Sequence, residues 1–149
     1  MTKRASPIRT TVMASDLMSV PVPHAQSSVR SKIRSHRDLL VWEKAMELAA
    51  LVFDLSSKFP SAQKFGLVAQ MTKSAASVPA NIAEGHARAT RKDYLHFVAI
   101  ANGSLMETQT YLKLAARLNY LTEDQAKQGC DLIREIAKIQ AVLRKHLKD

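Results

Sequence analysis

The chain has 149 residues and a formal net charge of +9, with 22 Lys and Arg against 13 Asp and Glu. Its four glycines and five prolines are too few for a turn-rich β fold, and abundant Ala, Leu, Lys and Met favour helices. The single cysteine, Cys130, excludes an internal disulfide and a cysteine-based zinc site. No apolar run approaches the ~20 residues that cross a bilayer, so we expect a cytoplasmic protein that does not contact membranes.

Residues 1–37 differ in composition from the remainder of the chain. They hold seven Lys or Arg against one acid, Asp16, without sustained apolar periodicity. Such a segment buries too little apolar surface to offset its ordering entropy, so we predict a disordered basic extension. Its composition also resembles an organelle transit peptide. We favour either a basic tail or a start codon assigned too far upstream, in which case Met13 or Met18 would be the true first residue. The folded domain is predicted over residues 38–149.

The first helix is expected to begin after Asp38, a good N-cap residue. A helix that is apolar over most of its circumference needs two packing partners, and this one has two apolar faces. We therefore expect one face to meet another subunit, with Val41 and Leu48 as candidates, although the sequence does not distinguish these two residues from the core. One face carries Trp42, Met46, Ala49, Phe53 and Ser56, and the opposite face carries Val41, Leu48, Leu51, Val52 and Leu55.

A second helix is predicted from a cap at Ser61 to a C-terminal glycine, Gly85, with Pro79 inside it. An interior proline removes a backbone hydrogen bond and costs about 3 kcal/mol. The apolar spacing nevertheless continues through it, so we predict one kinked helix and not two helices. We assign Pro79, Asn81, Glu84 and Gly85 to structure, since the polar pair can bond with groups around the kink. The apolar positions are Leu67, Met71, Ala75, Val78 and Ile82.

The third and fourth helices have recognisable starts. Thr90 to Asp93 resembles a capping box and precedes an apolar stripe from Tyr94 to Ala115, with Asn119 as the stop. Thr122 to Gln125 is a clearer capping box and precedes a stripe from Ala126 to Leu147. Short connections make consecutive helices antiparallel. The predicted fold class is therefore all-α, an antiparallel up-down-up-down four-helix bundle with a proline-kinked second helix.

Catalytic and metal chemistry find little support in the residue pattern. Di-metal bundles need two Glu-x-x-His pairs, and the nearest match is the single Asp93-Tyr94-Leu95-His96. The glycines are isolated, so no phosphate-binding loop is present in the sequence, and no cofactor is expected. Glu84 and Glu107 could meet across two helices as an acid–base pair. We prefer hydrogen bonds to Asn81, Ser104 or backbone freed by Pro79, because no substrate pocket or nucleophile is expected nearby. We predict that the chain is not an enzyme.

Basic residues form the remaining candidate site, one for nucleic acid. The folded part carries a net charge of +3 and the extension +6. Basic helical surfaces are usually only solvated, so this pattern alone is weak. The candidate contact residues are Lys73, Arg88, Arg91, Lys92, Arg134, Lys138 and Lys145.

Four segments carry a family resemblance: Asp38–Met46, Phe59–Pro60, Ser77–Gly85 and Ala101–Glu107. Together they resemble the bacterial four-helix bundle proteins encoded in intervening sequences of 23S ribosomal RNA genes. The same family includes the accessory variability determinant of diversity-generating retroelements. The resemblance covers about residues 38–147. Family members commonly carry a basic pair before the proline segment, where this chain has Lys73-Ser74, and this departure weakens a nucleic-acid role at that position.

The resemblance implies a homopentamer without known catalytic activity. It also implies possible partners, because the accessory determinant is thought to bind nucleic acid and a reverse transcriptase. The expected function is therefore a non-enzymatic oligomeric bundle that associates with RNA or DNA through a basic surface, as an accessory to RNA or reverse-transcriptase complexes. The alternative is a protein-interaction scaffold without nucleic-acid binding. Salt-dependent binding distinguishes the two, since phosphate contacts release counterions.

Overall fold

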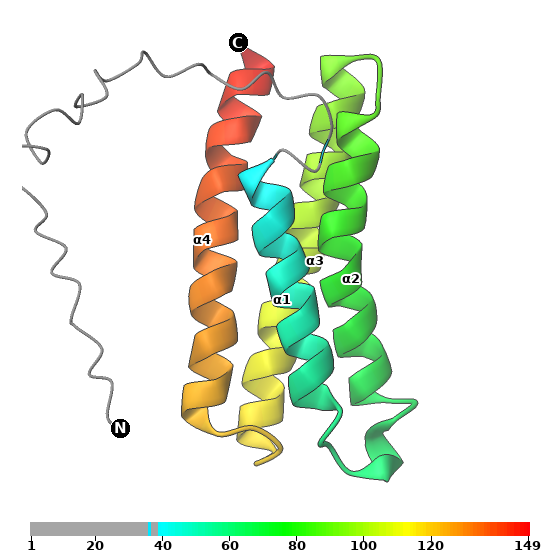
Figure 1. Cartoon of the computed structure of the whole chain (residues 1–149), viewed down its shortest axis with the longest axis vertical. Coiled ribbons are helices and arrows are strands. Elements are labelled where there is room, and N and C mark those ends of the chain that lie inside the picture. The colour runs from blue at the N-terminus through cyan, green and yellow to red at the C-terminus, as the bar shows by residue number, and fades with distance from the viewer. Residues whose placement is uncertain (1–35, 37–38) are drawn as a thin grey trace, which may run out of the picture. The chain divides into compact units, whose positions relative to one another are not determined.

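The structure is a computed structural model that describes His36 and residues 39–149. Its helices are α1 (Leu40–Ser56), the short 3₁₀ helix η2 (Ser61–Gln63), α2 (Leu67–His86), α3 (Arg91–Arg117) and α4 (Glu123–Lys148). Figure 1 shows the four long helices side by side, with consecutive helices joined at alternate ends. The predicted all-α class with four helices is confirmed. Apart from His36, the extension predicted over residues 1–37 lies outside the described residues.

The core follows the apolar stripes predicted for the second and third helices. Every predicted apolar position of α2 is buried, and α3 buries its stripe from Val98 to Ala115. α4 adds Ile133 and Ile136. Burying each Val, Leu, Ile or Met side chain of these stripes stabilises the fold by about 1.5–3 kcal/mol. No helix in the described ranges has the length and apolarity needed to cross a membrane.

The face assignment of the first helix was wrong. Val41 and Leu48, expected to face a neighbouring subunit, are 3% and 0% exposed and belong to the core. Met46 and Phe53, from the opposite face, are instead 44% and 53% exposed. Periodicity identifies two apolar faces of a helix, but it does not say which one the other helices cover.

Two helix starts differ from the prediction, and two agree with it. Asp38 lies outside the described residues, and α1 begins after Leu39 without a side-chain cap. Ser61 opens η2 and does not cap α2, which begins after Gly66. The Thr90 hydroxyl accepts a hydrogen bond from the Asp93 backbone N–H at 3.1 Å, and Thr122 forms the complete capping box with Gln125. The two helix starts with a capping-box motif were therefore predicted correctly, whereas the two starts predicted from a single cap residue were not.

Gly85 lies inside α2 and does not terminate it, which corrects the predicted C-terminal glycine. The helix continues to His86, and Gly85 packs against the first turns of α3. A Cβ atom at this position would lie 2.8 Å from Tyr94 Cδ2 and 2.9 Å from Phe97 Cβ. The absence of a side chain therefore serves the close approach of α2 to α3.

Candidate functional site

The segment around Pro79 is part of a continuous helix. Pro79 is buried, and because it has no N–H, the Ala75 carbonyl loses its usual helical donor. Two residues later, the Asn81 side-chain amide donates to the Ser77 carbonyl at 2.8 Å and to the Ser77 hydroxyl at 2.9 Å. The Asn81 side chain therefore ties together the turn that contains the proline.

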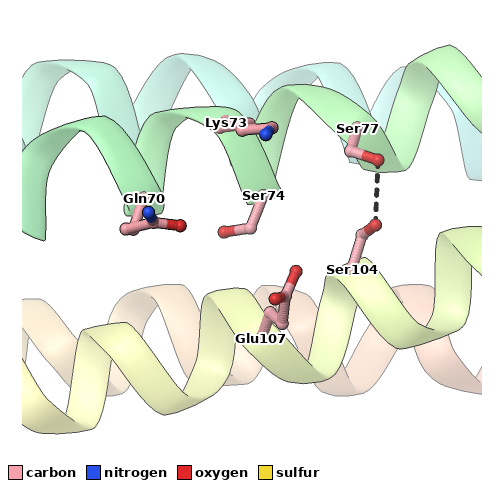
Figure 2. A pocket seen from close by; sticks show the side chains of 6 residues that line it. All are labelled: Gln70, Lys73, Ser74, Ser77, Ser104 and Glu107. Atoms are coloured by element: carbon pink, nitrogen blue, oxygen red, sulfur yellow. Dashed lines mark hydrogen bonds between the residues drawn. The ribbon is translucent and has the colours of Figure 1, made fainter.

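Hydroxyl groups connect this segment of α2 to α3. The Ser104 hydroxyl donates to the Ser77 hydroxyl at 2.9 Å, as Figure 2 shows. One turn away, the Thr108 hydroxyl is bonded to the Ser74 hydroxyl at 3.0 Å and to the Ser104 carbonyl at 2.8 Å. Ser74, Ser104 and Thr108 are all buried. These small side chains allow α2 and α3 to pack closely, and each of these three buried hydroxyls has a hydrogen-bond partner.

A polar groove of about 200 Å³ opens beside these hydroxyls. Lys73 and Glu107 are both exposed along it, but no ion pair joins them. In Figure 2 the Glu107 side chain extends from α3 toward α2. The groove is lined by Gln70, Lys73, Ser74, Ser77, Ser104 and Glu107.

Glu84 and Glu107 do not come together as an acid–base pair. Glu84 forms an ion pair with Arg88, one turn along α2, and no hydrogen bond joins it to described groups around Pro79, so its predicted role at the kink is wrong. The contact between Ser77 and Ser104 sets the register of the two helices, which places the two carboxylates about 15 Å apart along the helix axes. In the described part of the chain, no cluster of three His, Cys, Asp or Glu side chains is arranged to hold a metal ion.

The half-buried Cys130 thiol is poorly suited to act as a nucleophile. Burial raises its pKa above the ordinary thiol value, and this effect outweighs the opposing charge of Lys113. Because the thiolate is the reactive form, a raised pKa lowers the reactivity at neutral pH. The arrangement favours a packing role for this side chain.

Two of the seven candidate cations are held by neighbouring side chains. Arg88 pairs with Glu84 and lies over the Phe97 ring at 4.6 Å. Arg134 contacts Asp131 at 3.0 Å. The pKa of Asp131 is lowered, chiefly by a hydrogen bond from Lys127 and also by the charge of Arg134. Within residues 39–149, no ion pair is found for the other candidates, Lys73, Arg91, Lys92, Lys138 and Lys145.

The seven candidates do not form one site. Lys73 lies in the groove between α2 and α3, whereas Arg91 and Lys92 form the first turn of α3. Arg88 directly follows the C-cap of α2, and Arg134, Lys138 and Lys145 are distributed along α4. Figure 1 shows that the C-terminal end of α4 lies at the same end of the bundle as the turn between α2 and α3.

The fold brings five cations from two different helices to one end of the bundle. The first turn of α3 supplies Arg91 and Lys92, and the last turns of α4 supply Arg144, Lys145 and Lys148. We call these five residues the basic end. Arg144 and Lys148 were absent from the predicted contact set. A helical register places residues on one helix face, but it cannot bring the start of one helix to the end of another.

These features define an all-helical bundle with a tightly packed, hydroxyl-linked contact between α2 and α3 and a basic end. The comparisons agree with this class: residues 37–141 match the model of the family described as 23S rRNA-intervening sequence protein. The chain belongs to that family, as the resemblance indicated.

A solved structure supports the fold independently. It is a protein of unknown function from the S23 ribosomal protein family of Bacteroides thetaiotaomicron, with a TM-score of 0.67 and 29% sequence identity. The alignment covers 71% of this chain and 99% of that one. No curated protein matches the chain.

Proposed function

We propose that the chain is a non-enzymatic helical bundle that associates with RNA through its basic end. The observation that carries the proposal is the convergence of five cations from α3 and α4 at one end of the bundle. Family membership supports it, because the family takes its name from intervening sequences of 23S ribosomal RNA. RNA is preferred over DNA only on that ground.

The chemistry of the basic end suits phosphate groups and does not suit base recognition. Lys and Arg attract phosphates without reading sequence, and the N-terminus of α3 adds a partial positive charge beside Arg91 and Lys92. The most exposed aromatic side chains, Phe53 and Phe65, lie near the connection between α1 and α2, at the other end of the bundle from the basic end (Figure 1). Tyr94 packs against His86 and Tyr120 packs against Phe59. The expected binding is therefore strong at low salt and tolerant of sequence.

A pair of matched variants tests this proposal in the full chain. R91Q/K92Q removes two charges from the basic end, and K113Q/R117Q removes two exposed charges from the other end of α3. We expect R91Q/K92Q to weaken binding of a structured RNA severalfold and to reduce the slope of log affinity against log salt by about 1–2. The control variant should retain most of the affinity and slope.

The scaffold alternative has a distinct outcome. If structured RNA does not bind the full chain even at low salt, nucleic-acid association is contradicted and a protein-interaction role replaces it. A reverse transcriptase is the protein partner that the family resemblance implies, and co-purification with one would support an accessory role in such a complex.

We further propose that the chain assembles as a homopentamer of up-down-up-down bundles, with α2 bent at Pro79. The exposed apolar side chains of α1 support assembly, because they leave a face of the helix without packing partners inside the bundle. Multi-angle light scattering should give a mass near five times that of the 16.5 kDa chain. A stable monomer at micromolar concentration would contradict this proposal.

A further inference from the structure

The outer side of α1 is acidic as well as apolar. Leu40, Glu43 and Glu47 follow one another at spacings of three and four, and therefore form a stripe along the helix. Leu40 is 62% exposed, and both carboxylates are exposed. Neither carboxylate takes part in an ion pair with any described residue. We call Leu40, Glu43 and Glu47 the acidic stripe.

The outer side of α4 carries the complementary pattern. Arg134, Lys138 and Val142 are spaced four residues apart and form a second stripe, which we call the basic stripe. Val142 is 71% exposed, and the Arg134 side chain is 66% exposed. Arg134 contacts Asp131 through one nitrogen only, so its other donors remain available. Each stripe therefore combines one exposed apolar side chain with two like charges.

An ion pair within the bundle sets the relative height of the two stripes. Lys44 Nζ lies 2.9 Å from Glu135 Oε2, so these two residues lie at about the same height along the bundle axis. Heights along the bundle axis can be counted from this pair, with a rise of about 1.5 Å per residue in each of the two antiparallel helices. Glu43 and Lys138 then differ in height by about 3 Å, and so do Glu47 and Arg134. Leu40 is about 4–5 Å from the level of Val142 by the same rise. Measured from the same end of the bundle, the order is apolar, acid, acid on α1 and apolar, base, base on α4.

This order fits a second copy of the chain. In a ring whose axis is parallel to the bundles, every copy has the same direction, so residues at similar heights meet between neighbours. α1 and α4 are neighbouring helices. In a four-helix bundle the outer sides of two neighbouring helices face directions about a right angle apart. If each copy contacts its two neighbours through two such sides, the ring closes with about four or five copies.

We propose that the acidic stripe of one copy docks head to tail on the basic stripe of the next. Glu43 then pairs with Lys138, Glu47 pairs with Arg134, and Leu40 packs beside Val142. The inference rests on the oligomer of the proposed function and identifies its contact. It assigns Arg134 and Lys138 to subunit contact, and it leaves the basic end available for RNA.

Charge reversal tests the contact in the full chain. E43K and K138E each place like charges opposite one another, so each variant should assemble at least tenfold more weakly than the unsubstituted chain in sedimentation velocity. The double variant E43K/K138E exchanges the charges and should regain assembly. Equal mixtures of the two single variants should also form mixed complexes, because each variant keeps the charge that the other has lost. Two variants cannot alternate completely in a ring of five, so the mixture should assemble less well than the double variant.

Controls separate this contact from general effects of charge. E123K changes an acid in the first turn of α4, as E43K does in α1, and K113E changes an exposed lysine of α3. Both controls should assemble normally, and circular dichroism should give the same helix content for all variants.

If the unsubstituted chain assembles but E43K and K138E assemble equally well, this contact is wrong and the oligomer stands. If the exchange fails to restore assembly of folded variants, the pairing is also wrong. A monomeric unsubstituted chain contradicts both proposals, and RNA binding is measured separately.

Discussion

At the scale of single residues, glycines show how closely the helices approach. Gly85→Ala would place Cβ within 3 Å of Tyr94 Cδ2 and of Phe97 Cβ, and the second of these atoms is attached directly to the α3 backbone. We expect a loss of about 1–3 kcal/mol in the free energy of unfolding, because overpacking forces the backbone to shift. Urea denaturation of the full chain measures this effect.

Gly103 provides the matched control for that substitution. It lies inside α3, and apart from its own stretch of helix backbone no described atom would lie within 4 Å of a Cβ atom at this position. Gly103→Ala should therefore stabilise the protein by about 0.5–1 kcal/mol through helix propensity alone. Equal effects at the two glycines would contradict the close contact assigned to Gly85.

Gln140 is an unpaired polar side chain in the core. It is 1% exposed, and neither its amide nitrogen nor its carbonyl oxygen has a hydrogen-bond partner among the described residues. An unsatisfied buried polar group costs about 1–3 kcal/mol, so Gln140→Met should raise the free energy of unfolding by a similar amount. Gln128→Met, at an exposed position of the same helix, should change it by less than about 0.5 kcal/mol. Destabilisation by Gln140→Met would mean that the amide has a partner.

At the scale of elements, the continuity of α2 through Pro79 depends on its polar neighbours. Asn81→Ala removes the two hydrogen bonds to Ser77, so we expect a loss of about 0.5–1.5 kcal/mol and a lower melting temperature. Because this turn also contacts α3 through Ser104, assembly should weaken as well. Asn102→Ala is a suitable control, since no hydrogen bond of the Asn102 side chain is found in the described part of the chain. Unchanged stability with loss of RNA binding would instead make Asn81 a binding residue.

Elements were predictable where a local pattern determines the structure. The capping box at Thr122 and the core stripes of α2 and α3 follow from spacing alone, and the structure confirms them. The start of α2 was not predictable from Ser61, because this residue begins a separate 3₁₀ turn. The core face of α1 was also assigned wrongly, since both of its faces are apolar and only the other helices decide between Val41 and Met46.

At the scale of the whole molecule, the candidate site was only partly predictable. Sequence identifies the cations of the chain, but their grouping depends on which helix ends meet. The two halves of the basic end, at Arg91 and at Lys145, are more than 50 residues apart along the chain and lie at the same end of the bundle. Net charge alone would have treated every cation as equivalent.

Location and total charge can be separated by experiment in the full chain. Replacing Lys3, Arg4 and Arg9 with Gln lowers the net charge from +9 to +6 at positions that precede the four helices, and K58Q/K64Q/K113Q makes the same change within the folded domain but away from the basic end. In the proposed pentamer, five folded parts of +3 each would carry about +15, so phosphates should be attracted even without the extensions. We therefore expect both triple variants to reduce RNA affinity modestly and by similar factors, because neither contains a residue of the basic end.

R91Q/K92Q, with only two charges removed, should weaken binding more than either triple variant. Fluorescence anisotropy with one structured RNA at several salt concentrations measures all three slopes. Direct phosphate contacts at the basic end predict the steepest loss of slope for R91Q/K92Q, since only contacts that neutralise phosphates release counterions. If the loss instead follows the number of charges removed, whatever their position, RNA binds the general field of the assembly and the basic end is not a site.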